Sequence, residues 1–549
     1  MTPKHLAVFA GLFAAGLAIW PSTGQAARTF APAEHRSARG SLFEWSPLIE
    51  QLQRLLVEFD LFAGPAAGRL TPETQQAIRA YQTQSGLTVN GVANEALLKH
   101  METVGRAETL KKRLAQARNE QVEKARSALQ GSAATRDLLE NDRPLLAALP
   151  PDGTEACFRN PEIDCLLKGA MAAIEDIGRQ DYRDWALRDI IRAQAAAGRV
   201  SAARANIKRL SDLRLVLVSL REAAASLAEA GYHAKAFHLA ETIPTPWNRA
   251  RALLAIATTT SDASPALEPL LALLPQLEDR SGAIEIAATL LADRGERGVT
   301  EDTAAIFRTI RSLLDNYREP SWIALGAVAA AYAHADLSSE AIEMLDQIGD
   351  ASRDQIALAE VAAMLARQGR LSEAIAAADR LRAPQLYVLA VTKIAAVEYR
   401  RGRPASAAGL LKQAETAVLD IERPFAADTA LAQIATGWAD LKEPEKAFGN
   451  IAKVKSAALG AQTLWEIAAN SVARDANAFS RAVAATDKIE SAFDRATTFA
   501  RAARDFSEAK IPMQAQRVFD LAVRETKAIR SGWWRARILS LLATVLIKI

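Results

Sequence analysis

Small and apolar residues recur in two-part units through most of the chain, from about residue 160 to the end. In each unit a stretch containing Ala-Leu and then Ile-Ala or Val-Ala precedes a short loop. A second stretch, with an alanine five residues beyond the loop anchor, follows it, as in IALAEVAAMLARQGRLSEA around Gly369. The apolar positions follow the spacing of one helix face. The pattern therefore predicts helix, loop, helix, with stacked pairs sharing a core because one pair alone cannot bury its apolar face.

The loops between these helices recur with a nearly constant period, which is the mark of a repeat architecture. The clear anchors are Gly198, Gly231, Asp336, Gly369 and Gly402, and 33 residues separate Gly198 from Gly231, Asp336 from Gly369 and Gly369 from Gly402. The interval from Gly231 to Asp336 has room for three irregular units. The period continues less clearly through Lys442, Asn477 and Lys510. We expect about ten helical hairpins between residues 160 and 549.

The period, the inter-helix Gly369 and Ala374 at the start of the second helix resemble tetratricopeptide-type repeats. The bulky aromatic residue that this family has early in its first helix is mostly absent here. The resemblance implies a long α-α superhelical solenoid over residues 151–549. Its concave face would be the binding site for an envelope protein or peptide.

A different pattern occupies residues 44–102. Ile49, Leu52 and Leu56 recur at helical spacing, and a glycine-containing turn follows at residues 64–68. Thr71 is suited to cap a second helix with Pro72 at its first position. Asn90-Gly91 predicts another turn before a third short helix. We expect a small three-helix domain.

These elements resemble the peptidoglycan-binding domain family in order and spacing. The matching elements are Leu52-Gln53, Gly68, Thr74, Ala77-Ile78, Tyr81-Gln82, Gly86-Leu87 and Asn90-Gly91. Three positions depart from the family pattern, namely Ala67, Thr71 and Ala96. The resemblance implies contact with peptidoglycan, and the candidate binding residues are Gln53, Gly68, Thr74, Tyr81, Gln82, Asn90 and Gly91.

Residues 103–150 are expected to be a charged helical spacer and a hinge. The first part carries a thin apolar stripe that includes Leu110 and Leu114 among many Lys, Arg, Glu and Gln residues. One interpretation is a solvated helix with charge pairs four residues apart. The other is a basic surface for an anionic wall polymer or lipid headgroups. Gly131, Pro144 and Pro150 mark the hinge.

The N-terminus has the layout of a secretory signal. Lys4 precedes an apolar run, Pro21 breaks that run, and small residues follow up to Ala26. We interpret residues 1–26 as a signal peptide and residues 27–43 as a flexible linker, and we expect a periplasmic protein. An uncleaved membrane anchor is the alternative, although no later segment has the length and apolarity of a membrane span.

The expected export bears on the two cysteines, Cys157 and Cys165, because disulfides persist outside the cytoplasm. They lie eight positions apart, and we expect a disulfide between them. Two buried thiols, or a redox pair, are the alternatives. The redox reading is weak because redox pairs usually have two intervening residues.

The sequence offers no recognisable catalytic or cofactor motif. Phosphate loops, dinucleotide fingerprints and Gly-x-Ser-x-Gly are absent, and His233 and His238 lack the spacing of a helical metal pair. Acids such as Asp346, Glu360, Glu373 and Glu415 are interpreted as solvated helix faces. We expect no enzyme activity, no metal and no cofactor. A paired-carboxylate, wall-degrading enzyme with a cryptic site remains the alternative function.

Composition and charge narrow the functions further. The formal net charge is +3, with nearly balanced acids and bases, so nothing predicts nucleic-acid binding. The whole reading is an all-α, non-catalytic envelope protein that contacts peptidoglycan through residues 44–102 and recruits a protein through its solenoid. A scaffold whose N-terminal domain does not bind glycan is a further alternative.

The last segment, SGWWRARILSLLATVLIKI, is apolar nearly all round. It corresponds to the first helix of a hairpin whose second helix is missing. One interpretation is burial against the preceding helices. The other is an exposed patch that forms a homodimer or binds a partner.

Overall fold

The computed structural model describes residues 46–139, 157–259, 265–298, 302–317, 320–348, 355–470 and 476–549. The signal peptide and linker predicted for residues 1–43 lie outside these ranges. In the described residues the secondary structure is helical, with no strand. The all-α prediction is confirmed. The chain forms two compact units, and their boundary falls between Lys124 and Ala125.

The smaller unit contains α2 (Pro47–Glu58), α3 (Pro72–Gln84) and the first part of α4 (Glu95–Gly131). Its small core includes Leu52, Ile78 and Tyr81, all almost fully buried. As expected, Thr71 caps α3 by accepting a hydrogen bond from the Thr74 backbone N–H, and Pro72 is the first helical residue. The three-helix domain predicted from the sequence is therefore present.

The helix α4 continues without a break through the charged segment that the sequence assigns to a spacer. Leu110 and Leu114 are exposed, whereas Ala125 and Leu129 near the end of α4 are buried in the core of the larger unit. The boundary between the two compact units therefore lies inside one helix. Beyond α4, the described chain continues to a short 3-10 helix, Arg136–Leu139.

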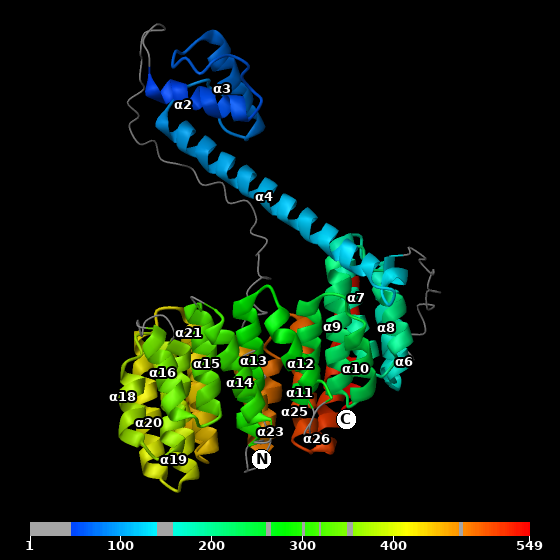
Figure 1. Ribbon diagram of the computed structural model, residues 1–549, viewed down its shortest axis with the longest axis vertical. Coiled ribbons are helices and arrows are strands. Elements are labelled where there is room, and N and C mark those ends of the chain that lie inside the picture. The colour runs from blue at the N-terminus through cyan, green and yellow to red at the C-terminus, as the bar shows by residue number, and fades with distance from the viewer. Residues whose placement is uncertain are drawn as a thin grey trace. The chain divides into compact units, whose positions relative to one another are not determined.

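The larger unit consists of helical hairpins in two layers (Figure 1). Odd-numbered helices contact one another in chain order, and each even-numbered helix packs on its odd-numbered neighbours. We call these layers inner and outer. The inner helices are α7 (Gln180–Ala196), α9 (Leu213–Glu229), α11 (Pro246–Thr259), α13 (Arg280–Arg297), α15 (Trp322–His334), α17 (Gln355–Arg367), α19 (Pro384–Arg400), α21 (Pro424–Asp440), α23 (Ala457–Asn470), α25 (Ala492–Glu508) and α27 (Gly532–Leu546). The outer helices are α6 (Ile163–Glu175), α8 (Val200–Ile207), α10 (His233–Glu241), α12 (Leu267–Leu273), α14 (Thr303–Asp315), α16 (Ser338–Ile348), α18 (Leu371–Asp379), α20 (Pro404–Ala417), α22 (Pro444–Ile451), α24 (Ala476–Thr486) and α26 (Pro512–Thr526).

The repeat anchors are the turns between the two helices of a hairpin, and they share one backbone conformation. Seven of them have positive φ: Gly198, Gly231, Asp336, Gly369, Gly402, Lys442 and Lys510. The following backbone N–H donates to the carbonyl five residues earlier, as from Arg199 to Gln194 and from Arg370 to Leu365. This is the Schellman helix ending, which glycine adopts without strain. The period in the sequence therefore reflects the regular spacing of the residues that end the first helix of each hairpin.

One anchor was placed wrongly. Asn477 lies in the first turn of α24 and not in the turn before it, since α24 begins at Ala476. In the other seven hairpins the outer helix begins two residues after the anchor. Gly298, which does not follow the spacing of the anchors, has φ of 67° and ends α13.

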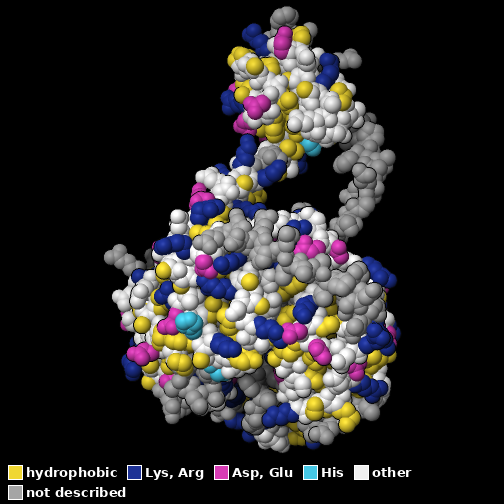
Figure 2. Space-filling model, turned by 90° about the vertical axis from the view of Figure 1, so that its right-hand side faces the viewer, with side chains coloured by type: hydrophobic (Ala, Val, Ile, Leu, Met, Phe, Trp, Pro, Cys, Tyr) yellow, Lys and Arg dark blue, Asp and Glu magenta, His cyan; other side chains and the backbone are white. Residues whose placement is uncertain are grey.

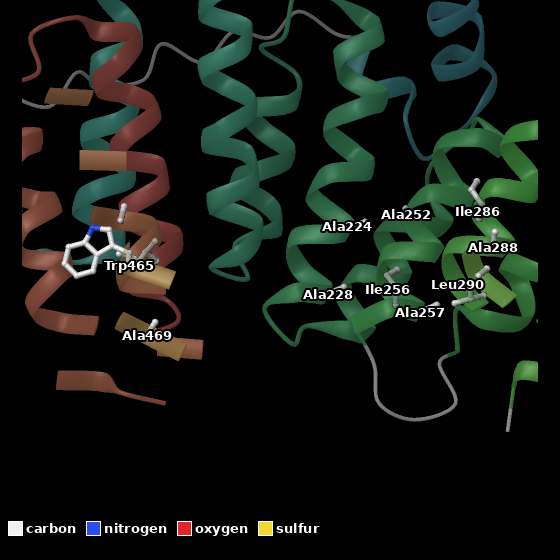
Figure 3. Close-up of a cluster of buried hydrophobic side chains, with 14 of the residues drawn as sticks. Ala224, Ala228, Ala252, Ile256, Ala257, Ile286, Ala288, Leu290, Trp465 and Ala469 are labelled. Carbon is white, nitrogen blue, oxygen red and sulfur yellow. The ribbon is translucent and has the colours of Figure 1, made fainter. Parts of the chain in front are cut away.

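Alanine sets the packing of the inner layer, and Figure 3 displays part of it. Ala224 and Ala228 of α9 lie beside Ala252 and Ile256 of α11, and all four are buried. Alanine removes little rotamer entropy on burial and allows helix backbones to approach closely. The alanine five residues beyond each correctly placed anchor is also buried, as Ala374 is.

The array closes on itself. The last helix, α27, packs against α25 and α26 and also against α6 and α7 at the start of the array. The side chains of Arg537 and Asp189 form an ion pair of 2.8 Å, and Tyr182 stacks on Trp533 with ring centroids 5.0 Å apart. Therefore α6 is the missing second helix of the last hairpin, supplied from the opposite end of the sequence.

This closure decides between the two readings of the C-terminal segment. No residue of α27 is exposed, because its apolar surface is covered by helices of the same chain. The covering helices include α6 and α7 as well as the preceding ones. The predicted homodimer required an exposed apolar patch on this helix, and α27 has no such patch.

Charged side chains of both signs are interspersed on the face of the larger unit shown in Figure 2. That distribution agrees with the near balance of acids and bases in the sequence. Among the described helices, none combines the length and the apolarity that a membrane crossing requires.

Candidate functional site

Two buried glutamines hold the two turns of the small unit. The first, Gln53 on α2, is 1% exposed and serves the turn before α3. Its Nε2 donates to the carbonyl of Arg69 and to Oγ1 of Thr74, both at 2.9 Å. Its Oε1 accepts from the backbone N–H of Gly68 at 2.8 Å. Every polar group of this buried amide is thus used, as burial requires.

The second glutamine, Gln82 on α3, repeats this arrangement at the other turn. Its Oε1 accepts from the backbone N–H groups of Asn90 and Gly91 at 3.0 and 2.9 Å. Its Nε2 donates to Oδ1 of Asn90 at 2.8 Å. Gly68 and Gly91 have φ of 70° and 68°, the left-handed region that glycine tolerates best. The paired Gln and Gly positions of the sequence pattern therefore form the same arrangement twice: a buried glutamine side chain accepts a hydrogen bond from the backbone N–H of a turn glycine.

The seven candidate residues consequently have mostly structural positions. Six of them are buried, namely Gln53, Gly68, Thr74, Tyr81, Gln82 and Gly91, and only Asn90 is exposed. Tyr81 donates to or accepts from Nδ1 of His100 at 3.0 Å, and burial raises the pKa of its hydroxyl. These side chains shape the surface, while contact with any ligand falls to exposed neighbours.

The exposed neighbours include two arginines and two valines. Arg69 follows Gly68, and the Arg79 side chain lies directly over the Asn90-Gly91 turn. A Cβ on Gly91 would come within 2.7 Å of Nε of Arg79, so the Arg79 side chain would have to shift. Val89 and Val92 flank the turn and are 51% and 41% exposed. The sequence pattern did not identify these four residues, because it consists of the residues that form the turns and not of the exposed residues beside them.

The three departures from the family pattern leave the turns intact. Thr71 keeps its turn by capping α3, and Ala67 and Ala96 are exposed. Oδ1 of Asn94 accepts from the backbone N–H of Leu97 at 2.8 Å and so caps the start of α4. The departures thus change surface groups and not the fold.

In the larger unit, one charged cluster is more buried than the sequence suggested. Glu360 is 4% exposed, so its interpretation as a solvated helix face is wrong. It pairs with Lys393 of α19 and lies 3.5 Å from Nε2 of His334. Nδ1 of His334 lies 3.0 Å from Glu296 of α13. The inner layer brings these side chains together from four consecutive repeats.

Burial dominates the electrostatics of this cluster. Desolvation, with a further contribution from Glu360, raises the pKa of Glu296 to about 6. Desolvation also lowers the pKa of His334, against the attraction of Glu360. His334 lies between the two carboxylates and contacts both, so the side chains of the cluster interact with one another in a continuous chain from Glu296 to Lys393. Within the described ranges, no group of His, Cys, Asp and Glu has the arrangement to hold a metal ion.

Cys157 and Cys165 form a disulfide with Cα atoms 5.6 Å apart, as expected. It lies at the start of α6, and Cys157 is buried. The adjacent Phe158 ring packs under the guanidinium of Arg535 of α27 at 5.5 Å. The disulfide therefore belongs to the place where the array closes.

Comparisons with known proteins give one informative match. No curated protein matches the chain. A solved structure, "Crystal structure of Ton1535 from Thermococcus onnurineus NA1", is 14% identical, covers 57% of this chain and 97% of its own, and has a TM-score of 0.25.

The informative match concerns the smaller unit. Residues 46–101 match the family described as "Putative peptidoglycan binding domain". The matched range contains both glutamine-held turns and ends within α4. This family and the disulfide fit an extracellular or envelope location. Residues 46–101 are thus a domain similar to the putative peptidoglycan-binding family, attached to a closed array of helical hairpins.

Proposed function

We propose that this is a non-catalytic periplasmic protein that binds peptidoglycan through residues 46–101. The observation that carries the proposal is the family match over a domain whose two characteristic turns are both intact. The exposed Arg69, Arg79, Val89 and Val92 would contact the wall polymer, because they surround the turns that the buried residues hold in place.

Export to the periplasm is part of this proposal. It rests on the leader-like layout of residues 1–26 and on the disulfide between Cys157 and Cys165. A disulfide of this kind persists in an oxidising compartment.

The helical array would recruit a protein partner. Trp322 and Ile323 of α15 and Ile356 of the neighbouring α17 are 43%, 51% and 43% exposed. Exposed large apolar side chains on adjacent helices favour a protein contact. A pull-down from an envelope extract with the full mature chain, compared with a Trp322→Ala and Ile356→Ala variant, tests this role.

Co-sedimentation with purified sacculi tests the main proposal. The full mature chain should enter the pellet, and an Arg69→Ala and Arg79→Ala variant should do so much less. An Arg54→Ala and Lys99→Ala variant removes two other exposed charges from the same domain, and it should bind as the parent does. Equal binding by all three proteins would contradict the assignment to this surface.

The enzyme alternative needs a different readout. A zymogram with the same preparations would reveal a cleared band if the chain degraded the wall. We expect no clearing. A cleared band from the full chain would overturn the non-catalytic part of the proposal.

A further inference from the structure

Three consecutive inner helices carry arginines on the face that the outer helices leave uncovered. Arg188 lies on α7, Arg221 on α9 and Arg251 on α11. The buried residues of these helices lie mostly on their other sides. Neighbouring packed helices have axes about 8–10 Å apart, so the three guanidiniums form a row across the repeats.

The row has more positive than negative charge. Glu222 is the carboxylate paired with it, and its Oε1 lies 2.6 Å from Arg188 and 3.7 Å from Arg221. Burial lowers the pKa of Arg221, and the nearby charges of Arg251 and Arg188 lower it further. Two carboxylates lie near the three cations, because Glu285 of α13 also interacts electrostatically with Arg251. The row therefore keeps an excess of one positive charge in a partly desolvated place.

Hydrogen-bonding capacity is also left over. Nε of Arg188 and Oε2 of Glu222 are buried atoms without a hydrogen-bond partner. Arg221 donates only a long bond of 3.4 Å to Asn248. A carboxylate ligand on this row would accept hydrogen bonds from the accessible N–H groups of these guanidiniums, including that of Arg221, whose bond to Asn248 is long.

Aromatic rings lie beside two of the three arginines. The guanidinium of Arg188 is 5.4 Å from the ring centroid of Trp185, and that of Arg251 is 5.7 Å from the centroid of Trp247. Trp185 is 52% exposed although it lies on an inner helix. An aromatic ring is a flat apolar platform, and an adjacent guanidinium gives it a fixed anion-binding edge.

We propose that Trp185, Arg188, Arg221 and Arg251 form a second wall-binding site, which takes a peptidoglycan strand through its sugar rings and the free carboxylates of its stem peptides. This rests on the proposed function, because the domain at residues 46–101 is what brings a wall polymer to this chain. An acidic protein segment is the competing ligand for these side chains, and the titrations below distinguish the two. Two linked sites on one polymer raise the overall avidity without any stronger individual contact.

Fluorescence or calorimetric titration of the full mature chain with soluble peptidoglycan strands tests the site. The informative variant is Arg221→Gln with Arg251→Gln, which leaves the Arg188–Glu222 pair in place. The matched control is Arg308→Gln with Arg311→Gln on the outer helix α14, which removes the same charge elsewhere. We expect about a tenfold loss of affinity in the first variant and no change in the control. Trp185→Ala should also weaken binding of strands.

Two further ligands separate the possible outcomes. Strands whose carboxylates have been converted to amides should bind the parent about as weakly as ordinary strands bind the Arg221→Gln and Arg251→Gln variant. Poly-L-glutamate that binds as tightly as strands, with no effect of Trp185→Ala, would show an acidic-peptide site and overturn the proposal.

The same preparations distinguish this proposal from the function on which it rests. If sacculus binding is lost only with the Arg69→Ala and Arg79→Ala variant, the inner-face site is refuted and the wall-binding function stands. If the parent binds neither sacculi nor strands, both are refuted.

Discussion

The two units of this protein are stabilised in different ways. The small unit has a core of seven buried apolar residues, and its turns depend on two buried glutamines. The larger unit has one core that runs through all its hairpins, with alanine at equivalent positions in most repeats. Stability in the small unit is therefore concentrated in single side chains. In the larger unit it is distributed, except where α6 and α27 close the array.

The largest effect is expected from a glutamine of the small unit. Gln53→Leu leaves the Gly68 N–H, the Arg69 carbonyl and the Thr74 hydroxyl without their present partner. We expect the free energy of unfolding of this unit to fall by about 3 kcal/mol. Hydrogen exchange of peptides from residues 46–101, compared with peptides of the larger unit, measures it.

Gln76→Leu is the control on the same helix, because Gln76 is exposed. It should change the stability by less than about 0.5 kcal/mol. Equal protection of the two variants would contradict the concentrated stability of the small unit.

A smaller loss is expected from the disulfide. Replacing Cys157 and Cys165 with serine removes a short covalent loop at the start of α6. The loop entropy predicts a loss of about 2.5 kcal/mol, and α6 and α27 should exchange fastest. Denaturant melts combined with hydrogen exchange test this prediction, and a uniform change over all hairpins would contradict the special position of the closure.

Gly532→Ala should open the closure without removing any bond. A Cβ at Gly532 would come within 2.5 Å of the Ala173 carbonyl oxygen on α6, so α27 has to shift. We expect a loss of about 2 kcal/mol. The measurement is the thermal midpoint together with the fluorescence of Trp533, which stacks on Tyr182 across the closure.

The control for this prediction is Gly409→Ala within α20, where a Cβ would meet nothing within 4 Å. It should stabilise the protein by about 0.5 to 1 kcal/mol, because glycine is a poor helix former. A destabilised Gly409→Ala variant would mean that the close contact with α6 is not the cause.

The smallest effect concerns pH. Burial raises the pKa of Glu296 to about 6 in the folded chain, above its usual value near 4.5. The folded state therefore binds more protons than the unfolded state between these values, and this group lowers stability as pH rises from about 4.5 to about 6. His334, with its lowered pKa, acts in the opposite direction up to about pH 6.5.

Glu296→Gln isolates the first contribution. Unfolding of the parent and the variant at pH 4.5 and pH 7 should differ in its pH dependence by about 1 kcal/mol or less, with the variant losing less stability as pH rises. Glu373→Gln is the exposed control, since its carboxylate pairs with Arg370 at the surface. An identical pH dependence of the Glu296→Gln variant and the parent would contradict the raised pKa.

The sequence by itself determined the local structure of both units. The spacing of Gly198, Gly231, Gly369 and Gly402 predicted the hairpins correctly, because a left-handed helix ending favours glycine and recurs in each repeat. Asp336, Lys442 and Lys510 have the same conformation without being glycine, and alignment of the repeats still found them. The Gln-Gly pattern of the small unit predicted its turns for a similar reason. In each case the signal lies within a few neighbouring residues or repeats at a fixed spacing.

Only the tertiary structure decided the closure and the positions of the charged side chains. The pairing of α27 with α6 joins residues such as Asp189 and Arg537, which are 348 positions apart in the sequence. The sequence of α27 shows that its apolar surface needs a cover, but no periodicity identifies α6 as the helix that covers it. The burial of Glu360 and the row of Arg188, Arg221 and Arg251 likewise depend on which face the neighbouring helices cover. A helical pattern fixes which residues share a face, and the packing of distant helices fixes where that face points.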